Sequence, residues 1–302
     1  NEYAWTSPEV MGFGAAGVIL MILFVLQERR AAEPILPLTL FRDPVFRVCS
    51  GVSLLVGLAL FGATVFLPMY FQVVTGASAT KSGLLVIPMV AGLMLTSIGS
   101  GRLISRTGKY RKYPILGAGI ATVGLALMSR LDVGTTRLES SVYMFVLGCG
   151  LGLMMQTLVL AVQNAVPHSE LGAATSGVTF FRSMGGAFGV AIFGTILNNR
   201  LNYYVPRNVP AALLQQLGSP SGSALARSRM VIDSLPDLAR IGTIQSFADA
   251  LQVVFMVTIP LAAIAFGLTW LLKEVPLRED AHVGGFSEVE IERVEEPAAV
   301  GE

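Results

Sequence analysis

The sequence predicts an all-α integral membrane protein with seven transmembrane helices, and three observations lead to this fold class. Hydrophobic residues make up 53% of the 302 positions and charged residues only 14%. The mean hydropathy of +0.66 is well above that of an ordinary soluble domain. Seven stretches are apolar over about 20 residues, the length that an α-helix needs to cross the hydrocarbon core of a bilayer.

The predicted spans follow the chain in order. They lie at 9–27, 46–73, 81–104, 113–131, 141–166, 170–199 and 247–272. The first connection contains three prolines and cannot be one helix, so we expect it to lie along the inner surface. The long connection at 200–246 mixes leucines with polar residues, which indicates short helices resting on the outer surface, as a lid or a passive cover. The acidic segment 273–302 has the composition of a disordered tail.

The turn GRLISRTGKYRKYP, residues 101–114, sets the orientation of the chain. It carries five cationic side chains and no acidic one, which is typical of a cytoplasmic connection. An odd number of spans then places Asn1 outside and the acidic tail in the cytoplasm. The predicted inner segments hold eleven Lys and Arg residues, against three in the short outer connections and five in 200–246. We therefore expect a multi-pass protein of the plasma membrane, in contact with the lipid bilayer.

Arg182, in the sixth span, is the clearest candidate for function, because an ionisable side chain at membrane depth is costly and often marks a pathway. It lies about twelve residues into the predicted helix, or roughly 15 to 18 Å from its start. Two interpretations stay open. The side chain could face a central cavity, where it would attract anionic groups or hold a carboxylate, or it could snorkel to the cytoplasmic interface.

Four amide side chains are further candidates for a substrate pathway: Gln72, Gln156, Gln163 and Asn164. Gln156 and Gln163 are seven residues apart and share a helix face. Such amides bind a polar substrate or tie helices together. The span interiors contain no Asp or Glu, since Asp249 and Glu170 are expected at helix ends.

Other motifs narrow the class of protein. Glycines at 148, 150, 152, 185, 186 and 189 have spacings that let helices approach closely. The sequence contains none of the common phosphate-loop, dinucleotide, zinc-protease or serine-hydrolase motifs. The sequence has only two histidines, and its two cysteines fall in apolar stretches, so a metal site has little support. We expect no enzyme, no metal and no nucleic-acid partner.

The basic turn resembles the helix-linking signature of the major facilitator superfamily, roughly Gly-x-Leu-x-Asp-Arg-x-Gly-Arg-Lys. The matching residues are Gly101, Leu103, Arg106, Gly108 and Lys109, whereas Ser105 stands where the family usually has Asp. Three longer stretches are together similar to the fourteen-helix drug/proton antiporter branch. They are ERRAAEPILPLTLF, FLPMYFQVVTGASATKSGLLVIPMVAGLM and AVQNAVPHSELGAATSGVTFFRSMGGAFGVAIFGTILNNRL.

The resemblance implies that the chain is the C-terminal half of a secondary active transporter. Residues 1–45 would form an extra transmembrane helix and an inner-surface linker, and 46–272 a six-helix bundle of two inverted three-helix repeats. It further implies efflux of small amphipathic, drug-like compounds by alternating access, driven by a proton gradient and without a cofactor. The partner would be an N-terminal bundle carrying the proton-coupling acids. Ser105 lacks the carboxylate that helps to hold the inner gate in the family.

Two alternatives stay open beside this interpretation. In one, the chain is a truncated product or a half-subunit that is inactive without a second bundle. In the other, seven spans with an outside N-terminus form a receptor. Against the receptor, the seventh span has no interior Lys for a retinal Schiff base and no Asn-Pro-x-x-Tyr motif.

Overall fold

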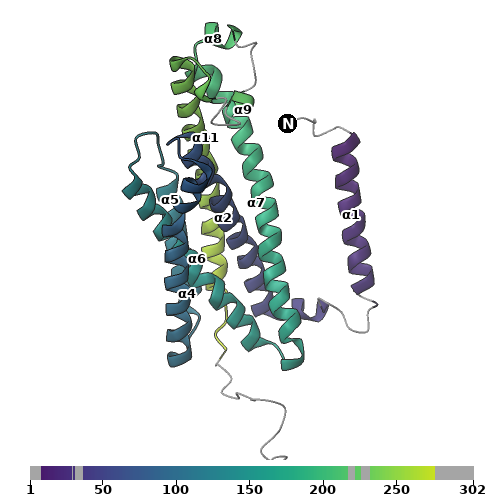
Figure 1. Ribbon diagram of the computed structural model, residues 1–302. Coiled ribbons are helices and arrows are strands. Elements are labelled where there is room, and N and C mark those ends of the chain that lie inside the picture. The colour runs from purple at the N-terminus through teal and green to yellow at the C-terminus, as the bar shows by residue number, and fades with distance from the viewer. Residues whose placement is uncertain (1–7, 29, 31–36, 217–221, 226–231, 276–302) are drawn as a thin grey trace, which may run out of the picture.

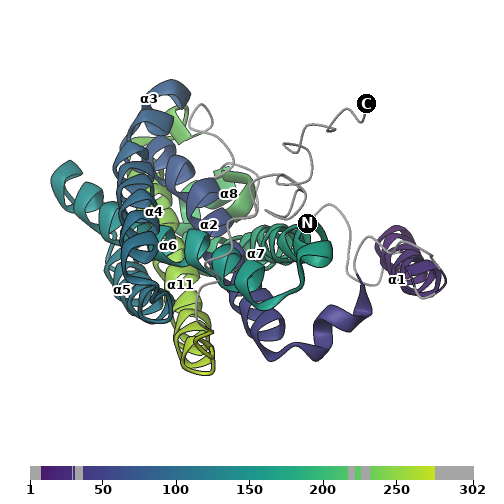
Figure 2. The same ribbon diagram turned by 90° about the horizontal axis from the view of Figure 1, so that it is seen from below.

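The structure, a computed structural model, describes residues 8–28, 30, 37–216, 222–225 and 232–275, which contain helices and turns but no strand. Most of the predicted acidic tail lies outside the described residues. Six long helices form a bundle (Figure 1): α2 Pro44–Val73, α4 Ile87–Thr107, α5 Lys112–Met128, α6 Arg137–Ala165, α7 Leu171–Asn208 and α11 Asp237–Trp270. Helix α1, Pro8–Glu28, stands apart from this bundle (Figure 2). Short helices complete the described part: η1 Leu38–Arg42, α3 Ala79–Leu84, η2 His168–Glu170, α8 Ala211–Gln216 and α9 Gly222–Leu225.

Among the described residues, six helices are long and apolar enough to cross a membrane. Helix α5, the predicted fourth span, is apolar but has only 17 residues. At 1.5 Å per residue it is roughly 26 Å long, slightly less than a hydrocarbon core of about 30 Å. The polar segment after Met128 ends the helix three residues before the predicted boundary at 131. The fold is all-helical and membrane-spanning, and the division into seven crossings stays a prediction.

The connection predicted at 200–246 is shorter in the structure, because both flanking helices continue into it. Helix α7 ends at Asn208, before the extended Val209, and α11 begins at Asp237, directly after Pro236. Both helices therefore extend past the predicted membrane spans, which end at 199 and begin at 247. Loss of hydrophobicity marks the edge of the apolar segment, whereas a helix continues until its backbone is interrupted. Asp249, expected at a helix end, lies inside α11.

Glycines bring the backbones of α2 and α7 into direct contact. A Cβ atom added to Gly57 would lie less than 3.0 Å from the carbonyl oxygen of Arg182. One added to Gly185 would lie equally close to the carbonyl oxygen of Leu54. Each glycine thus faces the carbonyl group three residues before the other glycine. Real Cβ atoms do not approach a carbonyl oxygen this closely, so the crossing requires glycine at both positions.

The crossing of α4 and α6 repeats this arrangement. Gly148 faces the carbonyl oxygen of Met89, and Gly92 faces that of Phe145, again three residues before the partner glycine. In the predicted repeats, α2 and α6 are the first helices and α4 and α7 the second ones. Two repeats related by a two-fold axis would produce two equal crossings of this kind. The two crossings are therefore equal in form, and the division into inverted repeats stays a prediction.

We predict that Gly185→Ala lowers stability by about 1–3 kcal/mol or more, because the new methyl group overlaps the carbonyl of Leu54. Thermal unfolding in detergent can be followed with a thiol-reactive dye, since Cys49 is buried and Cys149 partly buried. Gly172→Ala, on the same helix with nothing within 4 Å of its new Cβ, is the control and should change little. Equal melting temperatures for the two variants would contradict the role of the crossing.

Candidate functional site

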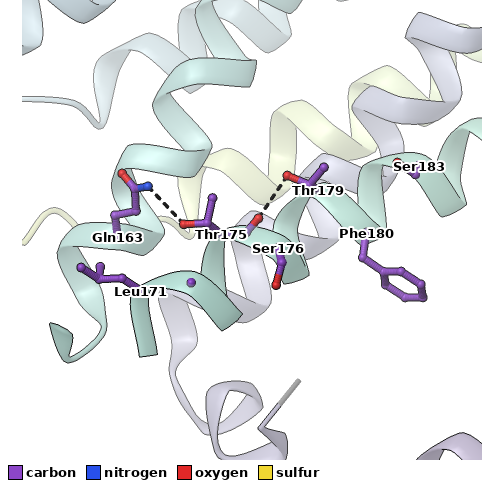
Figure 3. Close-up of a pocket in the computed structure, with 8 residues that line it drawn as sticks. Gln163, Leu171, Thr175, Ser176, Thr179, Phe180 and Ser183 are labelled. Carbon is purple, nitrogen blue, oxygen red and sulfur yellow. Dashed lines mark hydrogen bonds between the residues drawn. The ribbon is translucent and has the colours of Figure 1, made fainter. Parts of the chain in front are cut away.

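A pocket of about 620 Å³ opens between the C-terminal end of α6 and the first turns of α7 (Figure 3). It lies near the end of the bundle that carries the basic turn. Its lining combines four hydroxyl groups, one amide, one aromatic ring and small or apolar surface: Gln163, Leu171, Gly172, Thr175, Ser176, Thr179, Phe180 and Ser183. Among the residues that the structure describes, no charged side chain belongs to this lining.

The hydroxyl groups lie on α7 because of their spacing. Thr175, Thr179 and Ser183 are four residues apart, which places them on one face of the helix. The amide nitrogen of Gln163 donates a hydrogen bond of 3.1 Å to the hydroxyl of Thr175 and so links α6 to α7. The hydroxyl of Thr179 donates to the carbonyl of Thr175 at 3.1 Å (Figure 3). With Phe180 beside them, these groups offer neutral hydrogen-bonding partners next to an apolar surface.

Arg182 lies next to the pocket. One terminal nitrogen of its guanidinium is 3.5 Å from the hydroxyl of Thr179, a lining residue. The side chain is half-buried, and no salt bridge joins it to an acidic group within the described residues. Its carbonyl oxygen faces Gly57, so the helix crossing fixes its backbone. A positive charge therefore stands beside a polar pocket, and both interpretations of Arg182 stay predictions.

The structure separates the other predicted amides from this pocket. Gln156 is exposed on α6, two turns before Gln163 and on the same face. Asn164 is buried and donates to the carbonyl of Val275 at 3.0 Å. Gln72 donates to the hydroxyl of Ser82 at 3.1 Å and ties α2 to α3. For Asn164 and Gln72, these bonds favour the helix-tying interpretation.

The hydroxyl groups of α7 and Phe180 were not among the residues singled out from the sequence. Their signal is the recurrence of Thr and Ser every four positions in TSGVTFFRS, next to Arg182. Serine and threonine are ordinary in apolar helices, where they bond to the backbone of their own helix. The recurrence of Thr and Ser indicates a polar pocket only once the structure shows that α6 does not cover this face of α7.

The residues of the predicted gating motif form the end of α4. Gly108 is the C-cap of this helix with a φ of 68°, a left-handed conformation that favours glycine. Gly101 is half-buried, and Leu103, Arg106 and Lys109 are exposed. Ser105 donates to the carbonyl of Gly101 on its own helix at 3.0 Å. Within the described residues, this motif therefore makes no bond to another helix of the bundle.

The next two residues hold α11 to the turn instead. The hydroxyl of Tyr110 donates to the carbonyl of Lys273 at 3.3 Å and accepts from the amide of Val275 at 2.9 Å. Arg111 donates to the carbonyl of Trp270 at 3.0 Å. Tyr110 is fully buried, and this burial raises the pKa of its hydroxyl, so the phenol stays protonated and keeps its donor.

The sequence profile of the Major Facilitator Superfamily matches residues 3–190. The chain belongs to this superfamily. The chain is 42% identical over 279 residues to an uncharacterized MFS-type transporter of Mycobacterium tuberculosis (strain CDC 1551 / Oshkosh), covering 92% of the chain and 40% of that protein. It is 34% identical over 237 residues to the multidrug transporter protein MdtP of Bacillus subtilis (strain 168), covering 78% and 43%.

A third relative is the tetracycline resistance determinant of Streptomyces rimosus, 33% identical over 200 residues, which are 65% of the chain and 57% of that protein. The chain thus spans between 40% and 57% of the length of these relatives. Its superfamily and its apolar helices make it a multi-pass membrane protein of a transporter family.

A solved structure has a similar fold, the bacterial homolog to the human lysosomal transporter Spinster in an inward-facing and occupied conformation. Its TM-score is 0.60, with 76% of this chain and 49% of that chain covered. The sequence identity is 15%, so this likeness concerns the fold alone.

We predict that Ser183→Cys, in a background without Cys49 and Cys149, reacts with a charged thiol reagent from water. We expect water to fill the pocket. A thiol there can ionise, and the thiolate is the form that reacts. Ile192→Cys is the control on another side of α7 and should react at least about tenfold more slowly, because a thiol in hydrocarbon stays protonated. Equal rates would contradict a water-filled pocket.

We predict that Tyr110→Phe loosens the segment after α11 by about 1–3 kcal/mol, because the amide of Val275 loses its acceptor. Hydrogen exchange at residues 271–275 should become faster. Tyr113→Phe is the control, since the Tyr113 hydroxyl makes no hydrogen bond within the described residues. The bond that the hydroxyl donates to Lys273 should be intact below the ordinary tyrosine pKa of about 10 and lost only as the pH rises through the raised pKa. Unchanged exchange in Tyr110→Phe would refute this role.

Proposed function

We propose that the protein containing this chain exports small amphipathic, drug-like compounds from the cell by alternating access, driven by the proton gradient. The pocket between α6 and α7 is the observation that carries this proposal. Its neutral hydroxyl and amide groups can pair with polar atoms of many compounds, and Phe180 adds apolar surface. Such a lining accepts amphipathic molecules without the exact charge pairing that a single metabolite would require.

The relatives support the choice of substrate class. One is named a multidrug transporter and another a tetracycline resistance determinant, and both names describe those proteins. A further relative, 29% identical over 285 residues, is an MFS-type efflux pump of Mycosarcoma maydis. These names refer to multidrug transport, tetracycline resistance and efflux. We extend efflux of drug-like compounds to this chain because its pocket lining combines neutral polar groups with apolar surface.

In this proposal, residues 46–272 are the C-terminal bundle of a fourteen-helix transporter of the cell membrane, and 1–45 are the helix and linker before it. The partner is an N-terminal bundle of the same transporter, with the proton-coupling acids. The fraction of each relative that the chain spans supports this place. The basic turn would face the cytoplasm, and the connections at the other end the outside.

Arg182 would contribute a positive charge at the edge of the pathway. Within the described residues it bonds to the hydroxyl of Thr179 and forms no salt bridge, so its charge is available to a ligand or to the opposite bundle. Thr175, Thr179 and Gln163 would supply hydrogen bonds to the substrate. In the described structure these groups bond to each other and to the backbone of α7. They would give up these bonds to bond to a substrate, so the substrate would not need one fixed orientation.

The proposal is tested by measuring dye efflux from cells that lack their own major pumps and express the gene encoding this chain. Loading with ethidium and then restoring energy should give export, and a protonophore should stop it. Arg182→Ala should lower the initial rate about tenfold, equal to 1.4 kcal/mol of barrier. Arg240→Ala is the control. Arg240 forms a salt bridge of 3.0 Å with Asp237, and this pair does not belong to the pocket.

The outcomes separate the parts of the proposal. Export that continues with protonophore present would refute proton coupling, and no export above empty cells would refute efflux of this class. An unchanged rate in Arg182→Ala, with membrane insertion intact, would instead favour the snorkelling interpretation of Arg182.

A further inference from the structure

A second pocket, of about 330 Å³, lies between α7 and α11 toward the end opposite to the basic turn. Its lining residues are Ile196, Asn199, Arg200, Tyr203, Val253 and Val257. The four α7 residues recur at helical spacing and form one stripe. At about 100° per residue, this stripe lies on a different side of α7 from Thr179 and Ser183. The pocket is therefore separate from the candidate transport site in both height and direction.

The polar rim of this groove is positively charged. Arg200 is exposed and forms no salt bridge within the described residues. Arg207 stacks on the ring of Tyr203, with its guanidinium carbon 3.3 Å from the ring centre, and donates to the carbonyl of Tyr203 at 2.9 Å. These contacts hold Tyr203 in place at the groove and add a second positive charge close to it.

No acidic side chain of α7 offsets these charges, because α7 contains no Asp or Glu. On α11, Asp249 lies one turn before Val253. Its carboxylate already accepts hydrogen bonds from Asn208 at 3.3 Å and from Gln245 at 2.9 Å. The described surroundings of the groove therefore favour an anion.

The height of the groove matches the boundary between headgroups and hydrocarbon. Asn199 is the last residue of the predicted apolar span on α7, and Arg200 and Tyr203 lie beyond it, where the headgroups of a bilayer are expected. Val253 and Val257 lie six and ten residues inside the predicted apolar span 247–272, where acyl chains are expected. The groove thus has a cationic rim at the level of lipid phosphates and an apolar floor at the level of acyl chains.

We propose that this groove is a binding site for an anionic phospholipid. Arg200 and Arg207 attract the phosphate, Asn199 and Tyr203 hydrogen-bond to the headgroup, and one acyl chain lies against Val253 and Val257. The site does not depend on what the protein transports. It would hold α7 and α11 together on the side away from the transport pocket.

Native mass spectrometry of the purified protein can test this site, with phosphatidylglycerol and phosphatidylcholine of identical acyl chains. Phosphatidylglycerol should be retained about tenfold more strongly, a difference of 1.4 kcal/mol. Arg200→Gln and Asn199→Asp should abolish this preference, the first by removing a cation and the second by adding an anion of nearly the same shape. Equal retention of both lipids by the unaltered protein would overturn the proposal.

Controls separate this site from general electrostatic attraction. Arg240→Gln removes a cation at the same end, outside the groove, and should keep the preference. Loss of the preference in Arg240→Gln, or its persistence in Arg200→Gln, would overturn the site. Phosphatidylglycerol should raise the melting temperature of the protein. Glycerol phosphate at equal concentration should not, because it lacks the acyl chains. An equal rise would overturn the assignment to a lipid.

Discussion

The arrangement of the bundle depends on direct backbone contact at two helix crossings. Hydrocarbon solvates apolar side chains as well as protein does, so packing must hold transmembrane helices together. At Gly57 and Gly185 the surfaces of α2 and α7 meet without any side chain between them. This contact also fixes the candidate site, because the carbonyl facing Gly57 belongs to Arg182. The register of α7 against α2 thus decides where Arg182 and the hydroxyl stripe before it lie.

Polar networks hold the helices at both ends of the bundle. Tyr110, in the basic turn before α5, joins this turn to the segment after α11. At the other end, the amide of Gln245 donates to Asp249 at 2.9 Å and to Asp132 at 3.4 Å, and so joins α11 to the turn between α5 and α6. Tyr70 of α2 donates to the carbonyl of Asp132 at 2.7 Å. With both ends tied and the middle in backbone contact, these helices form one packed unit, and the polar pocket lies at the edge of that unit.

The sequence predicts the apolar helices well, because about 20 consecutive apolar residues have few alternatives in a protein. It does not predict the ends of α7 and α11, since the helices continue beyond the apolar stretches, past Asn199 in α7 and before Phe247 in α11. Arg182 and Gln163 could be singled out because such residues are rare at membrane depth. Tyr110 could not, because its partner Lys273 lies 163 residues further along the chain. Long-range partners of ordinary residues become visible only in the folded chain.

The basic turn has a different structural role from the one its motif suggests. Ser105 has no charge and bonds within its own helix, so the turn has no carboxylate at this motif position to pair with its cations. Arg111 instead donates to the carbonyl of Trp270, the last residue of α11. The final carbonyls of a helix lack partners within the helix and carry partial negative charge, so a cation there satisfies both needs. Within this bundle, the turn that is predicted to orient the chain in the membrane therefore also caps its last helix.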